Sequence, residues 1–192
     1  MRLFAAVEID PAVKVRVGGV IEELQRAAIA HAPRARIAWI PPERLHLTVR
    51  FIGEVDEGRA AAIGAAFEPP FRTPSFDVVV GGVGAFPAKG NPRVVWAGIA
   101  EGATALVDLE REVSDRLTGC GVQKEDRPFR PHLTLARVRD AAGLRTVPLL
   151  EGLVDRTLGR SRVDAITLFQ SRLSPKGPTY VPLLRTPLSH GT

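Results

Sequence analysis

The sequence predicts a mixed α+β fold built from two related lobes with mainly antiparallel strands. The tetrapeptide His-Leu-Thr-hydrophobic occurs twice, at residues 46–49 and 132–135. Each copy is preceded by the same order of predicted elements: a strand, a helix and a segment that contains prolines. The two stretches have similar lengths. Such a repeat indicates an internal duplication, so we expect two lobes related by a pseudo-twofold axis, with helices outside and a central cleft between them.

Composition is typical of a soluble globular protein, with 45% hydrophobic and 24% charged residues. The 192 residues fit one two-lobed domain, 1–192, because no polar stretch is long enough to separate independent domains. No apolar run approaches the ~20 residues of a membrane helix, and acidic residues come too early for a signal peptide. The lone Cys120 excludes an internal disulfide and a cysteine-rich metal site. We expect a cytoplasmic monomer with no membrane partner.

The net charge is +5, and arginine supplies 22 of the 26 basic residues. Two interpretations stay open. The arginine content reflects a general compositional bias, since Ala, Gly, Pro and Val are also abundant. Alternatively it serves a phosphate-bearing partner, because the guanidinium fork matches phosphate oxygens.

The first half is predicted to hold one helix and three strands. Asp10 is a suitable N-cap, Pro11 fits the first helical position, and apolar residues recur at helical spacing through residues 11–30. The strands are predicted at residues 2–7, 38–40 and 46–52.

The second half repeats this order, with a strand at 93–99, a helix at 103–117 and a strand at 132–138. Further strands are predicted at residues 75–80, 82–86, 163–170 and 179–184, and a weak helix at 140–154. The tail, residues 185–192, is expected to be peripheral.

The spacing His-x-Thr places two polar side chains on one face of a strand, because alternate residues share a face. His46 and Thr48 then face one way, and Leu47, Val49 and Phe51 face the core. His132 and Thr134 share a face in the second copy in the same way. With the lobes related by a pseudo-twofold axis, one histidine is expected on each side of a shared cleft.

That arrangement suits a phosphodiester, since in-line displacement needs a base behind the attacking oxygen and an acid beside the leaving oxygen. The hydroxyls of Thr48 and Thr134 would donate hydrogen bonds to the non-bridging oxygens. Arg44 and Arg130 each precede a histidine by two residues and are expected to lean toward the cleft. A single copy would mean nothing, and a metal site is the rival interpretation, although neither motif has a carboxylate within two residues.

The chain resembles the bacterial and archaeal RNA 2′,3′-cyclic phosphodiesterases, also called 2′-5′ RNA ligases, of the two-histidine phosphoesterase superfamily. The resemblance runs in order across nearly the whole chain. It is carried by residues 2–7, 39–54, 84–87, 93–96, 128–137 and 173–180, which include both His-x-Thr motifs.

The resemblance implies a bilobal fold with antiparallel sheets around a cleft, and opening of a terminal 2′,3′-cyclic phosphate to a 2′-phosphate without metal or cofactor. It implies that His46 is the proton donor and His132 the proton acceptor; the residues alone leave these roles open. The substrate would be an RNA end or a small cyclic nucleotide, and ligation through a 2′-5′ linkage would be the reverse chemistry.

Arg130 is the predicted phosphate-binding residue, and Tyr180 is the best predicted stacking partner for a base. Phe86 and Trp96 are weaker stacking candidates, with core packing favoured for Trp96. A non-catalytic module that binds nucleotides or RNA ends is the alternative function, and the intact pair of histidines favours the enzyme.

Overall fold

The computed structural model describes residues 1–88, 90–174 and 177–190, which form a single ten-stranded sheet with helices. Nine strands follow one path in the order β4-β10-β9-β1-β3-β7-β6-β5-β8, and β2 pairs with β7 beside that path. All strand pairs are antiparallel except β10 with β4, so the predicted α+β class with mainly antiparallel strands is confirmed.

The elements have the following bounds. The strands are β1 Arg2–Glu8, β2 Arg36–Trp39, β3 His46–Glu54, β4 Phe71–Pro74, β5 Phe76–Phe86, β6 Val94–Glu101, β7 Leu133–Asp140, β8 Thr157–Val163, β9 Ala165–Arg172 and β10 Thr179–Ser189. The helices are α1 Pro11–His31, the 3-10 turn η1 Pro42–Arg44, α2 Glu57–Phe67, α3 Ala103–Gly119 and α4 Thr146–Leu150.

The sheet has two matching halves that meet between β3 and β7. The first His-x-Thr motif begins β3, and His132 directly precedes β7, which holds the rest of the second motif; each strand is flanked on its outer side by the first strand of its own repeat, β1 or β6. One residue pair joins β3 to β7, Leu47 opposite Leu133, and β2 of the first repeat also pairs with β7. The predicted repeat of strand, helix and motif strand is present in both halves, within one continuous sheet.

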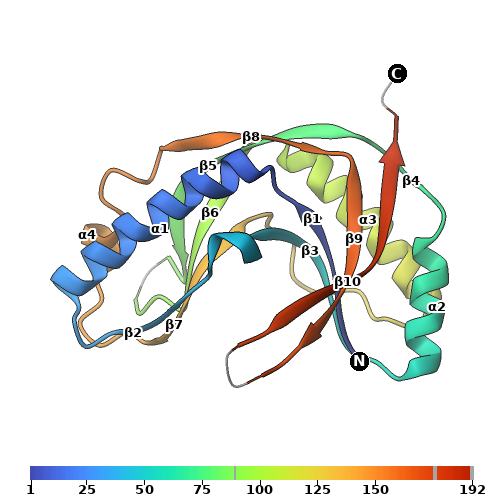
Figure 1. The fold of residues 1–192 in the computed structure, drawn as a ribbon, viewed down its shortest axis with the longest axis horizontal. Helices are drawn as coiled ribbons and strands as arrows, with labels where there is room; N and C mark the ends of the chain where they lie inside the picture. The colour runs from blue at the N-terminus through green and yellow to red at the C-terminus, as the bar shows by residue number, and fades with distance from the viewer. Residues whose placement is uncertain (89, 175–176, 191–192) are drawn as a thin grey trace.

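The helices cover the core face of the sheet, and each long helix crosses to the other half. Asp10 caps α1 by accepting a hydrogen bond from the Ala12 amide, as predicted. Helix α1 packs against β8 and α4, whereas α3 packs against β3 and β4. Figure 1 shows α1 and α4 at one end of the molecule and α2 and α3 at the other. The repeats are therefore interlocked rather than laid side by side.

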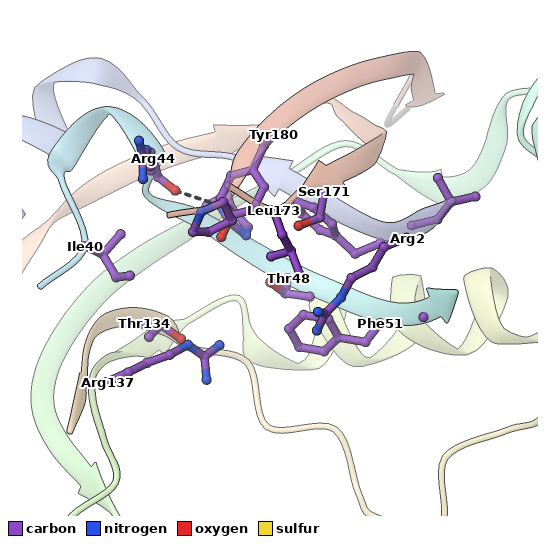
Figure 2. A pocket seen from close by; sticks show the side chains of 15 residues that line it. Arg2, Ile40, Arg44, Thr48, Phe51, Thr134, Arg137, Ser171, Leu173 and Tyr180 are labelled. Carbon is purple, nitrogen blue, oxygen red and sulfur yellow. Dashed lines mark hydrogen bonds between the residues drawn. The ribbon is translucent and has the colours of Figure 1, made fainter. Parts of the chain in front are cut away.

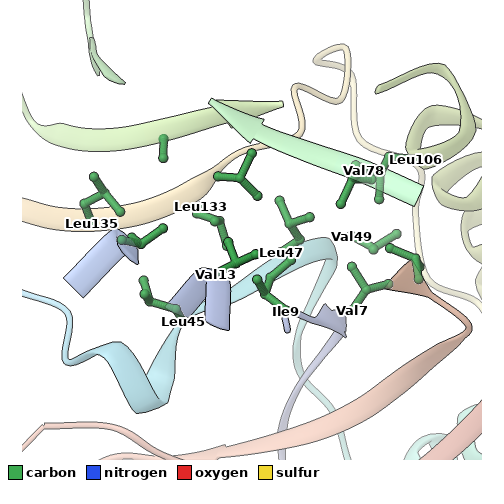
Figure 3. Close-up of a cluster of buried hydrophobic side chains, with 14 of the residues drawn as sticks. Val7, Ile9, Val13, Leu45, Leu47, Val49, Val78, Leu106, Leu133 and Leu135 are labelled. Atoms are coloured by element: carbon green, nitrogen blue, oxygen red, sulfur yellow. The ribbon is translucent and has the colours of Figure 1, made fainter. Parts of the chain in front are cut away.

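The core joins the two halves through side chains of both motif strands. Leu47 and Leu133 are fully buried, and they pack in one cluster with Leu45, Val49 and Leu135 (Figure 3). Burying apolar side chains on this face fixes which face the polar residues of each motif must take.

Both motif strands contain a β-bulge directly after the motif threonine. In β3, Thr48 pairs with Ala6 and Arg50 with Ala5, which leaves Val49 as the extra residue. In β7, Thr134 pairs with Trp96 and Ala136 with Val95, which leaves Leu135 as the extra residue at the equivalent position. Each bulge shifts the alternation of side chains by one residue, so two successive residues turn toward the core.

Several predicted elements need correction. The strands predicted at 75–80 and 82–86 are one strand, β5, with a register irregularity between Val80 and Val83 in its pairing with β6. The weak helix predicted at 140–154 is reduced to the short α4, where Pro148 and two glycines limit the helix. Helix α2 and strands β4 and β8 were not predicted. None of the helices among the described residues combines the length and apolar character that crossing a membrane requires.

The prediction that residues 185–192 are peripheral is wrong for residues 185–189, which belong to strand β10. Strand β10 continues past Leu184 in register with β9, and Thr186 and Leu188 are buried. The Thr186 hydroxyl donates a hydrogen bond to the Phe67 carbonyl, which ties the tail to the end of α2. Residues 191–192 of the tail, and residues 175–176 of the stretch that carried the resemblance, lie outside the described residues.

Candidate active site

The two motif histidines are held by the same backbone contact. His46 Nδ1 lies 2.7 Å from the Arg44 carbonyl oxygen, a bond drawn dashed from Arg44 in Figure 2, and His132 Nδ1 lies 2.7 Å from the Arg130 carbonyl oxygen. A carbonyl oxygen only accepts, so Nδ1 must donate in both rings. The Nε2 atom of each imidazole is therefore left to exchange a proton with a bound group.

The strand register brings the two motifs together. Because Leu47 lies opposite Leu133 in an antiparallel pair, His46 comes opposite Thr134, and Thr48 opposite His132. Both leucines point into the core, so all four polar side chains take the other face. In a regular ladder the diagonal pair, here the two histidines, is about 7–8 Å apart.

A cavity of about 450 Å³ lies over this face. Its wall is built by both motif strands: Thr48 and Phe51 come from β3, and Thr134 and Arg137 come from β7 (Figure 2). His46 also lines this cavity. His132 precedes Thr134 by two residues and is not among its lining residues.

The bulges explain two residues of this wall that the sequence reasoning missed. Phe51 was predicted to pack in the core by strict alternation, and that prediction is wrong: its side chain is 56% exposed and lines the cavity. The extra residue Val49 reverses the alternation, so Arg50 turns to the core and Phe51 to the cavity. Arg137 occupies the position equivalent to Phe51 after the bulge at Leu135 and lines the same cavity.

The cavity is positively charged. Three arginines line it, Arg2, Arg44 and Arg137, and among the described residues none of them has a carboxylate within 4.0 Å. No Asp or Glu belongs to the described lining. Figure 2 shows Arg2 and Arg137 reaching toward the cavity from opposite sides. Unpaired guanidinium groups on a partly enclosed wall favour an anionic ligand such as a phosphate.

His46 is enclosed by aromatic rings. The centroids of Phe4 and Tyr180 each lie 5.1 Å from the imidazole centroid, with Tyr180 edge-on. Burial lowers the pKa of His46 below its ordinary value and is the largest influence on it. The hydrogen bond to the Arg44 carbonyl opposes this effect, and the charges of Lys14 and Arg137 lower the pKa further.

His132 has a more open setting. Its ring lies edge-on to Phe86 with a centroid separation of 5.5 Å, and Phe86 in turn packs on Trp96 at 5.0 Å. The side chain of Arg130 is exposed and lines a separate depression beside Trp96, outside the cavity, while its carbonyl anchors His132. Phosphate binding by Arg130 stays a prediction.

The structure thus gathers His46, Thr48, Thr134 and Tyr180 at one cavity, and His132 directly precedes β7, outside the lining residues. Arg2, Phe51 and Arg137 were not predicted as site residues. Within residues 1–88, 90–174 and 177–190, no group of three or more His, Cys, Asp or Glu side chains is arranged to hold a metal ion.

Comparison with known proteins gives a consistent result. The 2′-5′ RNA ligase superfamily matches residues 11–174. The RNA 2′,3′-cyclic phosphodiesterase of Aeropyrum pernix is 40% identical over 156 residues, which cover 81% of this chain and 88% of that protein.

Two solved structures are similar over almost the whole chain. The protein TT0787 of Thermus thermophilus has a TM-score of 0.76 and 29% identity, with both chains covered completely. Escherichia coli LigT, solved in complex with 3′-AMP, has a TM-score of 0.72 and 26% identity, with 98% of each chain covered.

Proposed function

This chain belongs to the 2′-5′ RNA ligase superfamily, and we propose that it opens RNA 2′,3′-cyclic phosphates to 2′-phosphates with His46 as proton donor and His132 as proton acceptor. Its activity is that of an RNA 2′,3′-cyclic phosphodiesterase. The observation that carries the mechanism is the matched anchoring of two imidazoles on facing strands, each with Nε2 free.

The proposed reaction is a single in-line displacement at phosphorus. His132 Nε2 accepts a proton from water as the water oxygen bonds to phosphorus. The bond from phosphorus to the 3′ oxygen breaks, and that oxygen takes the proton from His46 Nε2. The product carries a 2′-phosphate and a 3′-hydroxyl, and exchange with solvent restores both imidazoles. With a ribose hydroxyl in place of water, the same steps form a 2′-5′ linkage, which is the proposed ligase activity.

The donor role requires that His46 hold a proton when substrate is bound. When no substrate is bound, burial lowers the pKa of His46, and the charges of Lys14 and Arg137 lower it further. These effects favour the neutral ring. A phosphate bound beside the ring opposes both cations, because an opposite charge nearby favours the charged form of a histidine. Substrate binding thus raises the pKa of His46 and supplies the protonated donor.

We propose that hydrogen-bond donors around the phosphate stabilise the remaining negative charge of the transition state. The side chains of Thr48 and Thr134 line the cavity from the two motif strands, and their hydroxyls donate to the non-bridging oxygens. Arg137 and Arg2 add two positive charges. We assign Tyr180 to contact with the nucleoside, because its ring borders the cavity beside His46.

The proposal includes a monomer that acts in the cytoplasm as one domain over residues 1–192, without metal or cofactor. One continuous hydrophobic cluster reaches both halves, which supports the single domain. No carboxylate among the described residues lines the cavity, which supports chemistry from imidazoles and cations.

The test is to incubate the protein with an RNA oligonucleotide that ends in a 2′,3′-cyclic phosphate and to identify the product by chromatography against both isomers. A 2′-phosphate is expected, with equal yield in EDTA. A 3′-phosphate would contradict the proposed leaving oxygen. Loss of activity in EDTA that a divalent cation restores would contradict the metal-independent mechanism.

A further inference from the structure

A second cavity, of about 600 Å³, lies on the other side of His46. It shares four lining residues with the first cavity, namely Phe4, Arg44, His46 and Tyr180. The outer wall comes from strands β9 and β10 and from the start of α1. A ligand whose reacting group lies at His46 can therefore extend into both cavities at once.

The second cavity carries its own cation. Lys14 lines it, and among the described residues Lys14 has no carboxylate within 4.0 Å. Lys14 and His46 line the same cavity, and the charge of Lys14 also lowers the pKa of His46. Arg185 also lines the cavity but is paired with Asp164 at 2.7 Å, and two carboxylates, Glu8 and Glu43, complete the charged lining.

The second cavity also offers aromatic and hydroxyl groups. Phe169 and Tyr180 supply ring surface, and Thr167 and Thr179 contribute side chains with hydroxyls. Sites that bind single-stranded nucleic acid combine such groups, because bases stack on aromatic rings and phosphates pair with cations and accept hydrogen bonds from hydroxyls.

The unpaired cations around His46 exceed what one cyclic phosphate requires. A 2′,3′-cyclic phosphate has a single negative charge, whereas Arg2, Arg44 and Arg137 line the first cavity and Lys14 lines only the second. An RNA strand supplies a further phosphate one ribose away from its terminal cyclic phosphate. In the second cavity, which adjoins His46, Lys14 and the shared Arg44 are the cations that could meet such a phosphate, beside the carboxylates Glu8 and Glu43.

We propose that the second cavity binds the phosphodiester that precedes the terminal nucleotide, with Lys14 as its cation, so that an RNA end is preferred over a cyclic mononucleotide. This inference rests on the proposed function, because it takes His46 as the point where the cyclic phosphate lies.

The experiment compares kcat/KM for cytidine 2′,3′-cyclic phosphate with kcat/KM for di- and trinucleotides that end in the same group. For the unmodified protein, we expect the first added nucleotide to raise kcat/KM about tenfold. Lys14→Ala is expected to lower the ratio of dinucleotide to mononucleotide kcat/KM about five- to tenfold. The slope of log kcat/KM against log salt for the dinucleotide should become shallower by about 0.7, the value for one phosphate contact on a single strand.

Lys124→Ala is the matched control, because Lys124 is an exposed lysine paired with Asp115 at 2.7 Å and lies outside both cavities. It should leave the ratio and the salt slope unchanged. Circular dichroism melting of both variants checks that neither substitution unfolds the protein.

The outcomes separate the two proposals. If the unmodified protein turns over neither substrate, the proposed function fails. If it turns over both with equal kcat/KM, only the second phosphate site is overturned. A Lys14→Ala variant that loses the same factor on both substrates would also overturn that site, since Lys14 would then act through His46 alone.

Discussion

The two copies of the motif share their backbone and differ in their surroundings. Both histidines donate from Nδ1 to the carbonyl two residues earlier, and both strands bulge directly after the motif threonine. His46, however, lies among aromatic rings between two cavities, whereas the one aromatic neighbour of His132 in the described part of the chain is Phe86. The two copies therefore share the backbone contacts that orient the imidazoles and differ in the side chains around them.

The segments that lead into the motifs differ in the same way. Before the first motif, β2 pairs with β7 as a strand of the sheet. Before the second motif, residues 121–131 form no strand, and Arg50 secures this segment instead. Arg50 is 4% exposed, donates to the Gln123 carbonyl at 2.5 Å, and lies 3.6 Å from Glu110 and 3.7 Å from Glu125. A buried side chain thus replaces a strand pairing, and it is available because the bulge at Val49 turns Arg50 to the core.

The largest expected effect tests whether both copies take part in chemistry. His46→Ala and His132→Ala should each lower turnover of a 2′,3′-cyclic phosphate at least ~100-fold, the scale of losing an acid or a base. Steady-state kinetics with saturating substrate measures this. Near-normal turnover in either variant would break the symmetry and exclude the two-histidine mechanism.

Arg50→Met tests the difference between the entry segments. We expect a loss of about 3 kcal/mol in the free energy of unfolding, because Glu110 loses a buried partner and the Gln123 carbonyl loses a donor. Urea denaturation measures it. Arg111→Met is the control, since the exposed pair of Arg111 with Asp108 should contribute under ~1 kcal/mol. Equal losses in the two variants would show that Arg50 does not secure the segment.

Thr48→Val and Thr134→Val compare the hydroxyls of the two copies. Each should lower kcat about tenfold or more, since one hydrogen bond to the charged phosphate is lost while shape is kept. KM should change less than kcat if the bond strengthens in the transition state. A loss confined to one variant would show that only one threonine faces the reacting phosphate.

The smallest expected effect concerns the electrostatic setting of the first copy. Arg137→Gln removes a cation that lowers the pKa of His46, so the pKa should rise and the imidazolium should persist to higher pH. It should stay below the ordinary value, because burial is the larger cause and remains. NMR titration of the His46 ring proton measures this, and Arg139→Gln should leave it unchanged. A fall in the pKa would contradict the sign.

The motif positions, the strand–helix–strand repeat and the cap at Asp10 could all be predicted, because they depend on local spacing and on single residue types. Phe51 and Arg137 could not, because a bulge is a property of strand pairing that alternation along one strand does not report. Arg130 was expected at the cleft through its side chain, and its carbonyl is what contacts His132. The buried tail was missed because one of its partners, the end of α2, lies 119 residues away in sequence.

The carbonyl anchors of the two histidines have a consequence for how the site tolerates genetic change. An imidazole oriented by a carboxylate side chain loses its partner in one substitution. Here the partners are main-chain oxygens of Arg44 and Arg130, which every amino acid possesses, proline included. Point mutation at residues 44 and 130 can therefore remove charge without removing the group that aims each ring. The orientation of each imidazole depends on the course of the backbone, so the side chains at residues 44 and 130 can change while that orientation is kept.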